Sequence, residues 1–173
     1  MNPYLQNKQL EDMIKEPSAG KQIGIIRLHM VREERTLSGM ERLSSPKDAV
    51  EIVRPVFAMA DREMMAVMSL TTKMEPLAFE IVAVGGLNRC IVDICNLFKH
   101  SLLNNTACVM CFHNHPSGDP KPSEEDHNIT RKIRDAGKIL EIELIDHIII
   151  GENQFYSFRE HGEIESTISK CVI

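Results

Sequence analysis

The chain has 173 residues, 43% of them hydrophobic, and a formal net charge of −5. This length and apolar content suit a single domain of ordinary size with a buried core. The negative charge argues against a protein whose main task is to coat nucleic acid, for which a basic surface is expected. Binding of nucleic acid through a local basic face stays compatible with the composition, but the overall charge does not support it.

The sequence also bears on the compartment. No apolar run approaches the ~20 residues that span a bilayer, and the N-terminus lacks the pattern of a secretory signal. Five cysteines are an odd number in a chain too long to need disulfide stapling. We therefore expect a cytoplasmic protein without a membrane partner, and a homo-oligomer is compatible with the sequence.

Helical and strand periods succeed one another along the chain. Ser45 and Pro46 have the cap and first-turn pattern of a helix start, and apolar residues between 129 and 140 recur on one helical face. The mixture predicts an α/β fold, with a mixed β-sheet and flanking helices. The predicted elements are a helix over 5–15, a strand over 22–30, a helix from Ser45 to about 56, strands over 64–70 and 76–84, a helix over 91–103, a strand over 107–112, a helix over 123–141, and strands over 143–150 and 154–158.

One stretch, residues 107–126, concentrates chemically active side chains. An apolar strand delivers His113 and His115, which can point to the same side because strand side chains alternate. A turn rich in Pro, Gly and Asp follows, and then Ser123 and Asp126. Two imidazoles and one carboxylate are a common catalytic zinc shell with water in the fourth position.

Parts of this stretch also have plain structural interpretations. Ser123 followed by Asp126 is the pattern of a helix N-cap with an acid three residues later. The Pro- and Gly-containing segment 116–120 is equally typical of a simple turn. The complete combination, His-x-His, seven residues and then Ser-x-x-Asp, is far more specific than any of its parts.

This combination resembles the motif of the JAB/MPN (JAMM) metalloproteases. The fuller string over 113–126, with Leu-Ile-Asp-His-Ile-Ile-Ile-Gly at 144–151 and Tyr-Ser-Phe-Arg at 156–159, resembles the RadC branch of that family. The resemblance covers about residues 44–162 and implies a JAB/MPN domain of cytidine-deaminase-like architecture. Residues 1–43 then form an N-terminal extension with one strand, unlike the helix-hairpin-helix region of full-length RadC, and 163–173 form a C-terminal tail.

The resemblance also implies roles for the residues of the motif. His113, His115 and Asp126 would hold one Zn²⁺. Ser123 would donate its hydroxyl to the oxyanion of a tetrahedral intermediate, the role of its counterpart in the family. A glutamate at the start of an earlier strand would act as the general base.

The position that matches this glutamate is Glu63, which directly precedes the predicted strand over 64–70. Glu75 and Glu80 are rivals, and Glu80 lies inside an apolar strand from which it could also face the site. The family places the base at a strand start, which favours Glu63. Without that context, Glu63 would be interpreted as an ordinary exposed acid.

The Cys-x-x-Cys spacing of Cys108 and Cys111 suggests a metal or redox site only superficially. Residues three apart on a strand face opposite sides, so we expect two reduced, buried cysteines that share no metal. Cys111 shares a strand face with His113. Asp146 and His147 lie in a predicted strand, and we expect them to be structural, or at most to contact the metal ligands from behind, rather than to bind the metal.

The sequence thus predicts a zinc-dependent metallohydrolase of the JAMM type that cleaves a peptide or isopeptide bond in a peptide or protein substrate. The alternatives are a RadC-type protein associated with DNA repair or DNA processing, and a non-catalytic MPN interaction module. A zinc deaminase would need both His-x-Glu and Pro-Cys-x-x-Cys; His-x-Glu occurs at residues 161–163, but Pro-Cys-x-x-Cys does not occur. The substrate itself is not encoded in any recognisable motif.

Overall fold

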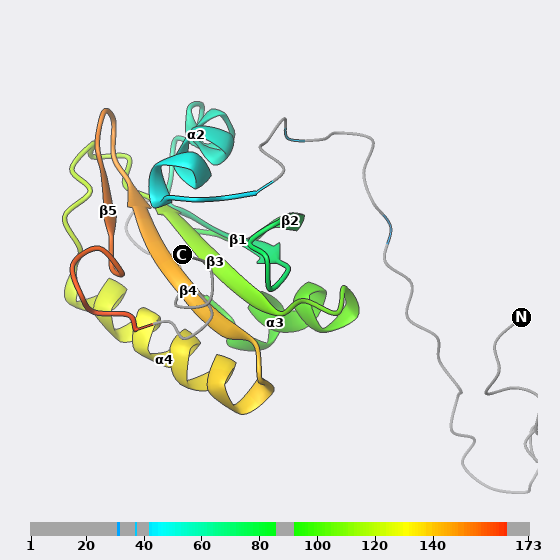
Figure 1. Ribbon diagram of the computed structural model, residues 1–173. Helices are drawn as coiled ribbons and strands as arrows, with labels where there is room; N and C mark the ends of the chain where they lie inside the picture. The colour runs from blue at the N-terminus through cyan, green and yellow to red at the C-terminus, as the bar shows by residue number, and fades with distance from the viewer. Residues whose placement is uncertain (1–30, 32–36, 38–41, 86–91, 166–173) are drawn as a thin grey trace, which may run out of the picture.

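A mixed five-stranded sheet forms the centre of the molecule (Figure 1). The structure, a computed structural model, describes residues 31, 37, 42–85 and 92–165. The predicted helix over 5–15 and strand over 22–30 lie outside these residues. The elements are α2 (Pro46–Phe57), β1 (Met64–Leu70), β2 (Pro76–Val84), α3 (Ile94–Leu103), β3 (Cys108–Asn114), α4 (Glu124–Leu140), β4 (Glu143–Ile150) and β5 (Phe155–Ser157).

The strands lie in the order β2-β1-β3-β4-β5. β3 and β4 run parallel, and the other neighbouring strands run antiparallel. A parallel pair needs a crossover connection, and α4 supplies it between β3 and β4. This connection places the N-terminus of α4 just beyond the C-terminal end of β3, so the end of the strand and the first turn of the helix can build one site.

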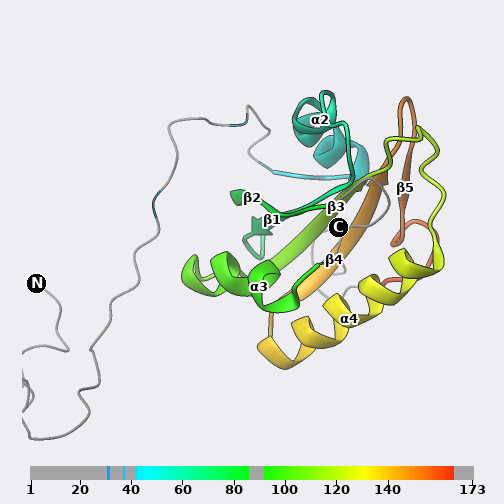
Figure 2. The same ribbon diagram turned by 180° about the vertical axis from the view of Figure 1, so that it is seen from behind.

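Helices cover both faces of the sheet, as Figures 1 and 2 show from opposite sides. One hydrophobic cluster combines α2 with alternate residues of the central strands, and a second combines those of the other face with α3 and α4. Cys108 belongs to the first cluster and Cys111 to the second, so the two cysteines lie on opposite faces, as strand alternation predicts. Both are buried free thiols, and burial raises the pKa of Cys108 to about 12.

The predicted α/β fold is confirmed, and most element bounds agree with the prediction. Ser45 caps α2 with Pro46 in its first turn. The helix predicted from residue 91 instead begins at Ile94, because the side chain of Asp93 accepts the N–H of Cys95 and so caps the helix there. β3 continues past residue 112 to Asn114 and therefore includes His113.

Two further features complete the fold. Ile164, in the segment predicted as a tail, is buried in the cluster beneath α3 and α4. Among the residues that the structure describes, no helix is long and apolar enough to cross a membrane.

Candidate metal centre

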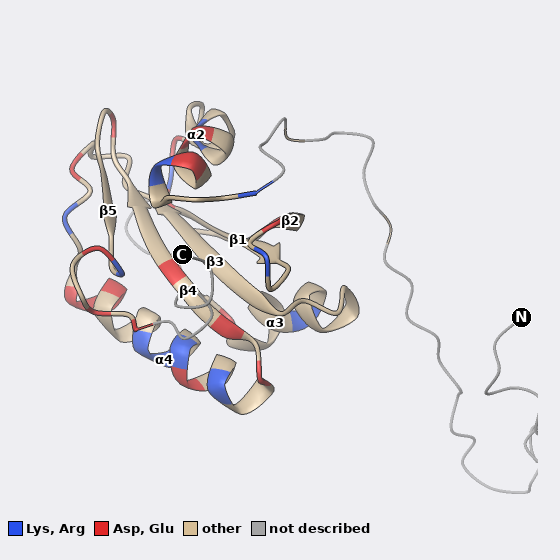
Figure 3. Cartoon of the chain, in the orientation of Figure 1, with Lys and Arg blue, Asp and Glu red and all other residues tan. Residues whose placement is uncertain are grey.

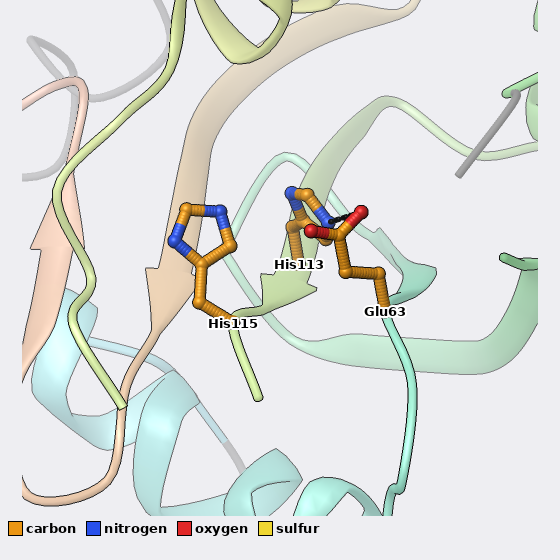
Figure 4. Close-up of side chains that lie close together, drawn as sticks. All are labelled: Glu63, His113 and His115. Carbon is orange, nitrogen blue, oxygen red and sulfur yellow. Dashed lines mark ion pairs between the residues drawn. The ribbon is translucent and has the colours of Figure 1, made fainter. Parts of the chain in front are cut away.

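Three side chains from two separate parts of the chain converge at the C-terminal end of β3. Glu63 stands just before β1, His113 is near the end of β3, and His115 follows that strand (Figure 4). One potential ligand atom from each lies within 4.8 Å of the other two. Nitrogen and carboxylate ligands of this kind are those that a catalytic zinc site uses.

Asp126 approaches both histidines from the first turn of α4. Nδ1 of His113 donates to Oδ1 of Asp126 at 3.0 Å, and Nε2 of His115 lies 3.5 Å from Oδ2. The 3.0 Å contact of His113 is a hydrogen bond, whereas the 3.5 Å contact of His115 falls within the about 3.3 to 3.6 Å expected between two ligands of one tetrahedral zinc. The three residues predicted as zinc ligands are brought together, with His113 and Asp126 only 6% and 4% exposed. The group of atoms close enough to share one metal ion, however, joins the two histidines to Glu63 and not to Asp126.

The ring of His113 is held between two carboxylates. Asp126 accepts a hydrogen bond from Nδ1 of His113, and Nε2 of His113 lies 3.8 Å from Oε2 of Glu63. This Nε2 atom is buried and has no hydrogen-bond partner among the residues that the structure describes. A buried nitrogen without a partner carries a desolvation cost, and a metal ligated at Nε2 would remove it.

His115 is oriented by the turn that follows it. Its Nδ1 lies 2.8 Å from the carbonyl oxygen of Asp119. A carbonyl can only accept, so Nδ1 carries the proton, and in the neutral ring Nε2 keeps the lone pair needed to bind a metal. Contact with Asp126 raises the pKa of His115 above its usual range.

The turn itself rests on the connection between β4 and β5. The N–H of Gly118 donates to the carbonyl of His115, and Gly118 has a φ of 85°, which suits glycine. The N–H of Glu152 donates to the carbonyl of Gly118 at 3.0 Å. Gly151 packs so closely beneath the turn that a Cβ there would lie 2.3 Å from the oxygen of Gly118.

Arg54 holds the β4–β5 turn from the side of α2. Its guanidinium, projecting from α2, donates to the carbonyls of Gly151 and Glu152, both at 2.9 Å, and to that of Gln154 at 3.4 Å. Three carbonyls on one planar guanidinium leave the β4–β5 turn little freedom. The position of His115 therefore depends on a residue of α2 that contacts neither histidine.

Ser123 and Asp126 form a reciprocal cap at the start of α4. The Ser123 backbone N–H and hydroxyl donate to Oδ2 of Asp126 at 2.7 and 2.6 Å, and the Asp126 N–H donates to Oγ of Ser123 at 3.2 Å. The predicted N-cap is thus present. Burial acts to raise the pKa of Asp126, but the bonds from His113, His115 and Ser123 outweigh it and hold the pKa well below its usual range.

The three glutamates considered as the base lie in different surroundings. Oε2 of Glu80 lies 2.8 Å from Nδ1 of His100, whose Nε2 contacts the hydroxyl of Ser69 at 2.6 Å. These contacts link β1, β2 and α3. Ser69 is fully buried, so this Ser-His-Glu chain of contacts presents no accessible nucleophile. Glu75 accepts from Thr71 in the β1–β2 turn. Of the three, Glu63 is the one grouped with the histidines.

Buried polar residues support the site from behind. The hydroxyl of Thr130 donates to the carbonyl of Asp126 and accepts from Nδ1 of His147, both at 2.6 Å. The His147 ring stacks on Phe158, with centroids 5.0 Å apart, and lies 6.4 Å from the ring of His113. Burial lowers the pKa of His147 to about 3, which keeps it neutral.

Asp146 has the structural role that we expected. It is fully buried, and its carboxylate accepts from the hydroxyl of Ser157 at 2.5 Å and from the N–H of Arg159 at 3.0 Å. Burial raises its pKa to about 6.

The charges on the neighbouring helix α4 are mixed: acids fill its first turn, and basic residues lie further along it (Figure 3).

Comparison with known proteins assigns the family. A family model described as "RadC-like JAB domain" matches residues 43–163. The chain belongs to the RadC-like JAB domain family. Similar proteins include a UPF0758 protein of Listeria innocua (40% identity over 136 residues, 79% of this chain and 59% of the relative), one of Desulfitobacterium hafniense (42% over 120 residues, 69% and 53%) and one of Methanosarcina mazei (40% over 124 residues, 72% and 54%).

These relatives set the extent of what the comparison supports. The chain spans a little over half the length of each of the three, and their shared name specifies no reaction. The RadC-like resemblance predicted from the sequence is confirmed by the family match. Together with the ligand geometry, this match supports a JAB fold that carries a potential metal site.

Sequence reasoning did not find several residues that build the site. It gave no role to Asn114, although this residue separates the two histidines, nor to Thr130 or Arg54. Asn114 carried one available signal, since a polar residue at the end of a buried strand needs a partner. The contacts of Arg54 join positions about 100 residues apart, and no local pattern reports them.

Proposed function

We propose that this RadC-like JAB domain is a zinc-dependent hydrolase that cleaves peptide or isopeptide bonds in a protein substrate. The observation that carries the proposal is the convergence of two histidines between two carboxylates, one on α4 and one before β1. The buried, partnerless Nε2 of His113 and the fixed tautomer of His115 both fit a metal ligated by neutral imidazoles.

His113, His115 and Asp126 would hold the zinc in this proposal. When bound, zinc supplies a Lewis acid that lowers the pKa of a water molecule to near neutrality. The acids of the first turn of α4 favour this arrangement, because a carboxylate near a helix N-terminus is stabilised by the helix dipole.

Glu63 would act as the general base. Its carboxylate stands on the side of His113 opposite to Asp126, where it can take a proton from the attacking water and deliver it to the leaving amine. Ser123 would donate its hydroxyl to the developing oxyanion. That hydroxyl donates to Asp126 in the structure, so Ser123 would have to exchange this partner for the substrate.

The assignment of the two carboxylates can be tested by metal analysis. Glu63→Gln should retain one zinc per chain and lose hydrolysis, whereas Asp126→Asn should lose the zinc. If Glu63→Gln loses zinc and Asp126→Asn retains it, Glu63 is the zinc ligand and Asp126 is the base. Glu80→Gln serves as the control, because Glu80 is paired with His100, and it should keep both zinc and activity.

The reaction class needs a panel of substrates. The zinc-loaded full chain should cleave linear or branched peptide substrates, with Glu63→Gln inactive on the same substrates. Nuclease substrates belong in the panel, because a RadC-type role in DNA processing is the alternative. Nucleic-acid cleavage that Glu63→Gln abolishes, without peptide cleavage, would replace the proposed peptidase by that alternative.

A further inference from the structure

Asn114, the residue between the two histidines, binds the backbone on both sides of Glu63. Its Oδ1 accepts the N–H of Met64 at 2.7 Å, and its Nδ2 donates to the carbonyl of Arg62 at 3.1 Å. The carbonyl of Glu63 accepts the N–H of Gly85 at 2.8 Å. Three consecutive residues around the carboxylate are therefore fixed by hydrogen bonds, two of them made by one side chain.

The sheet register explains why a side chain is used here. β1 and β3 pair antiparallel from Leu70 with Cys108 to Met65 with His113, so the next position on each strand is Met64 opposite Asn114. At that position the side chain of Asn114 takes the N–H of Met64. Glu63 thus leaves the sheet at a defined point beside His113.

The chemistry of the two contacts requires an amide. One partner is a backbone donor and the other a backbone acceptor, so they also settle which end of the amide is oxygen and which is nitrogen. Aspartate has the same shape but would place an oxygen against the Arg62 carbonyl. Alanine would leave both backbone groups without this partner. Asn114 is 5% exposed, so water cannot easily replace the lost bonds.

We propose that Asn114 is a positioning residue that holds Glu63 at the working distance from the histidine pair. This inference rests on the proposed role of Glu63 as the base. Through Asn114, the chain segment that carries the two histidines also sets the place of a carboxylate 51 residues upstream of Asn114. A displacement of about 1 Å at a reacting group can cost on the order of 100-fold in rate.

The first test compares Asn114→Ala and Asn114→Asp with the wild-type full chain, all loaded with zinc. Each variant should retain one zinc per chain and the wild-type KM, while kcat falls about 10- to 100-fold. Asn96→Asp is the matched control, since it adds the same charge at an exposed position of α3, and it should leave kcat unchanged. Thermal unfolding identifies a variant that fails to fold, and the other variant then decides.

Two outcomes of this test would overturn the inference. If kcat is unchanged in a folded variant, Asn114 does not position the base. If zinc is lost along with the rate, Asn114 maintains the histidine pair and not Glu63. A fall in kcat with zinc and KM preserved separates the positioning role from a general loss of structure.

The second test does not need hydrolysis and separates this inference from the proposed function. The Met64 amide should exchange with solvent at least about 10-fold faster in Asn114→Ala, whereas Asn114→Asp should keep it protected because Oδ1 remains. Crystal structures of the variants should show Glu63 moved away from His113. If the wild type cleaves nothing in the panel, the proposed function fails, and the clamp is judged on Met64 and Glu63 alone: unchanged exchange and an unmoved carboxylate would refute it.

Discussion

The substitution Gly151→Ala should damage the candidate metal centre from outside it. A Cβ at this position would lie 2.3 Å from the oxygen of Gly118 and 2.8 Å from Cδ of Pro120. Ordinary van der Waals contact begins at 3.4 Å, so one of the two backbones must move by about 1 Å. Overpacking of this kind costs about 1–3 kcal/mol, and here the opposing atom is a backbone oxygen that no rotamer change can move.

The β4–β5 side of this contact is the more firmly held. Arg54 fixes the carbonyls around residue 151, so the turn after His115 is the part that should shift. That turn carries the Asp119 carbonyl that fixes the tautomer of His115. Loss of such an outer contact typically weakens metal binding by about 10- to 100-fold.

Two measurements check this expectation. Zinc affinity, from competition with a chromophoric chelator, should fall within that range, and chemical denaturation of the metal-free protein should show a loss of about 1–3 kcal/mol. Gly162→Ala is the control: its φ of 76° makes alanine strained, but nothing lies within 4 Å of its Cβ position. Gly162→Ala should therefore lose stability without losing zinc affinity. Unchanged zinc affinity in Gly151→Ala would show that the turn does not position His115.

Ser123→Ala should lose the helix cap on α4, which lowers stability by about 1 kcal/mol, and should also lose turnover. Ser123→Asp should keep the cap but lose turnover. Near-normal turnover in Ser123→Asp would show that Ser123 acts only as a cap. In the metal-free folded protein, the pKa of His147 is about 3, below that of an unfolded histidine, so stability that is present above pH 6.5 is lost as the pH falls. Between pH 7 and pH 5, the free energy of unfolding of His147→Gln should therefore fall by about 2 kcal/mol less than that of the wild type. The same pH dependence of urea unfolding in the variant and the wild type would contradict this. Zinc at 100 times its Kd should stabilise the wild type by about 2.7 kcal/mol. A chelator should remove this stabilisation, and His113→Ala should not show it. Equal melting temperatures of the zinc-loaded and the chelated wild type would refute the prediction.

The fold was readable from the sequence because its elements have strong local signals. Residues 64–70, 76–84 and 143–150 were predicted as strands with the bounds that the structure shows. Caps were read equally well at Ser45 and Ser123. The start of α3 was placed too early, because apolar residues continue ahead of Asp93 while the helix starts after this capping side chain.

Within the site, the predictable part is the part that lies close together in the chain. His113, His115 and Asp126 fall within 14 consecutive residues, and strand alternation plus one helix cap are enough to bring them together. Glu63 depends on the pairing of β1 with β3, which no local pattern specifies, so its assignment needed the family resemblance. The contacts of Arg54 and of Thr130 with His147 depend on tertiary packing alone.

This division between local and distant residues has a consequence for the chemistry. The proposed zinc ligands belong to one strand–turn–helix unit, so metal binding should depend mainly on the segment from β3 to α4 and the turn beneath it. The proposed base, Glu63, is placed by the β1–β3 ladder, which runs without a register shift from Leu70 to Met65. A slip of one residue in that ladder would turn Glu63 to the other face while leaving both histidines and Asp126 in place. Asn114 belongs to both systems, since it follows His113 on the ligand-bearing strand and binds the backbone around Glu63. Metal binding and hydrolysis should thus be separable by mutation on the β1 side and lost together on the β3–α4 side.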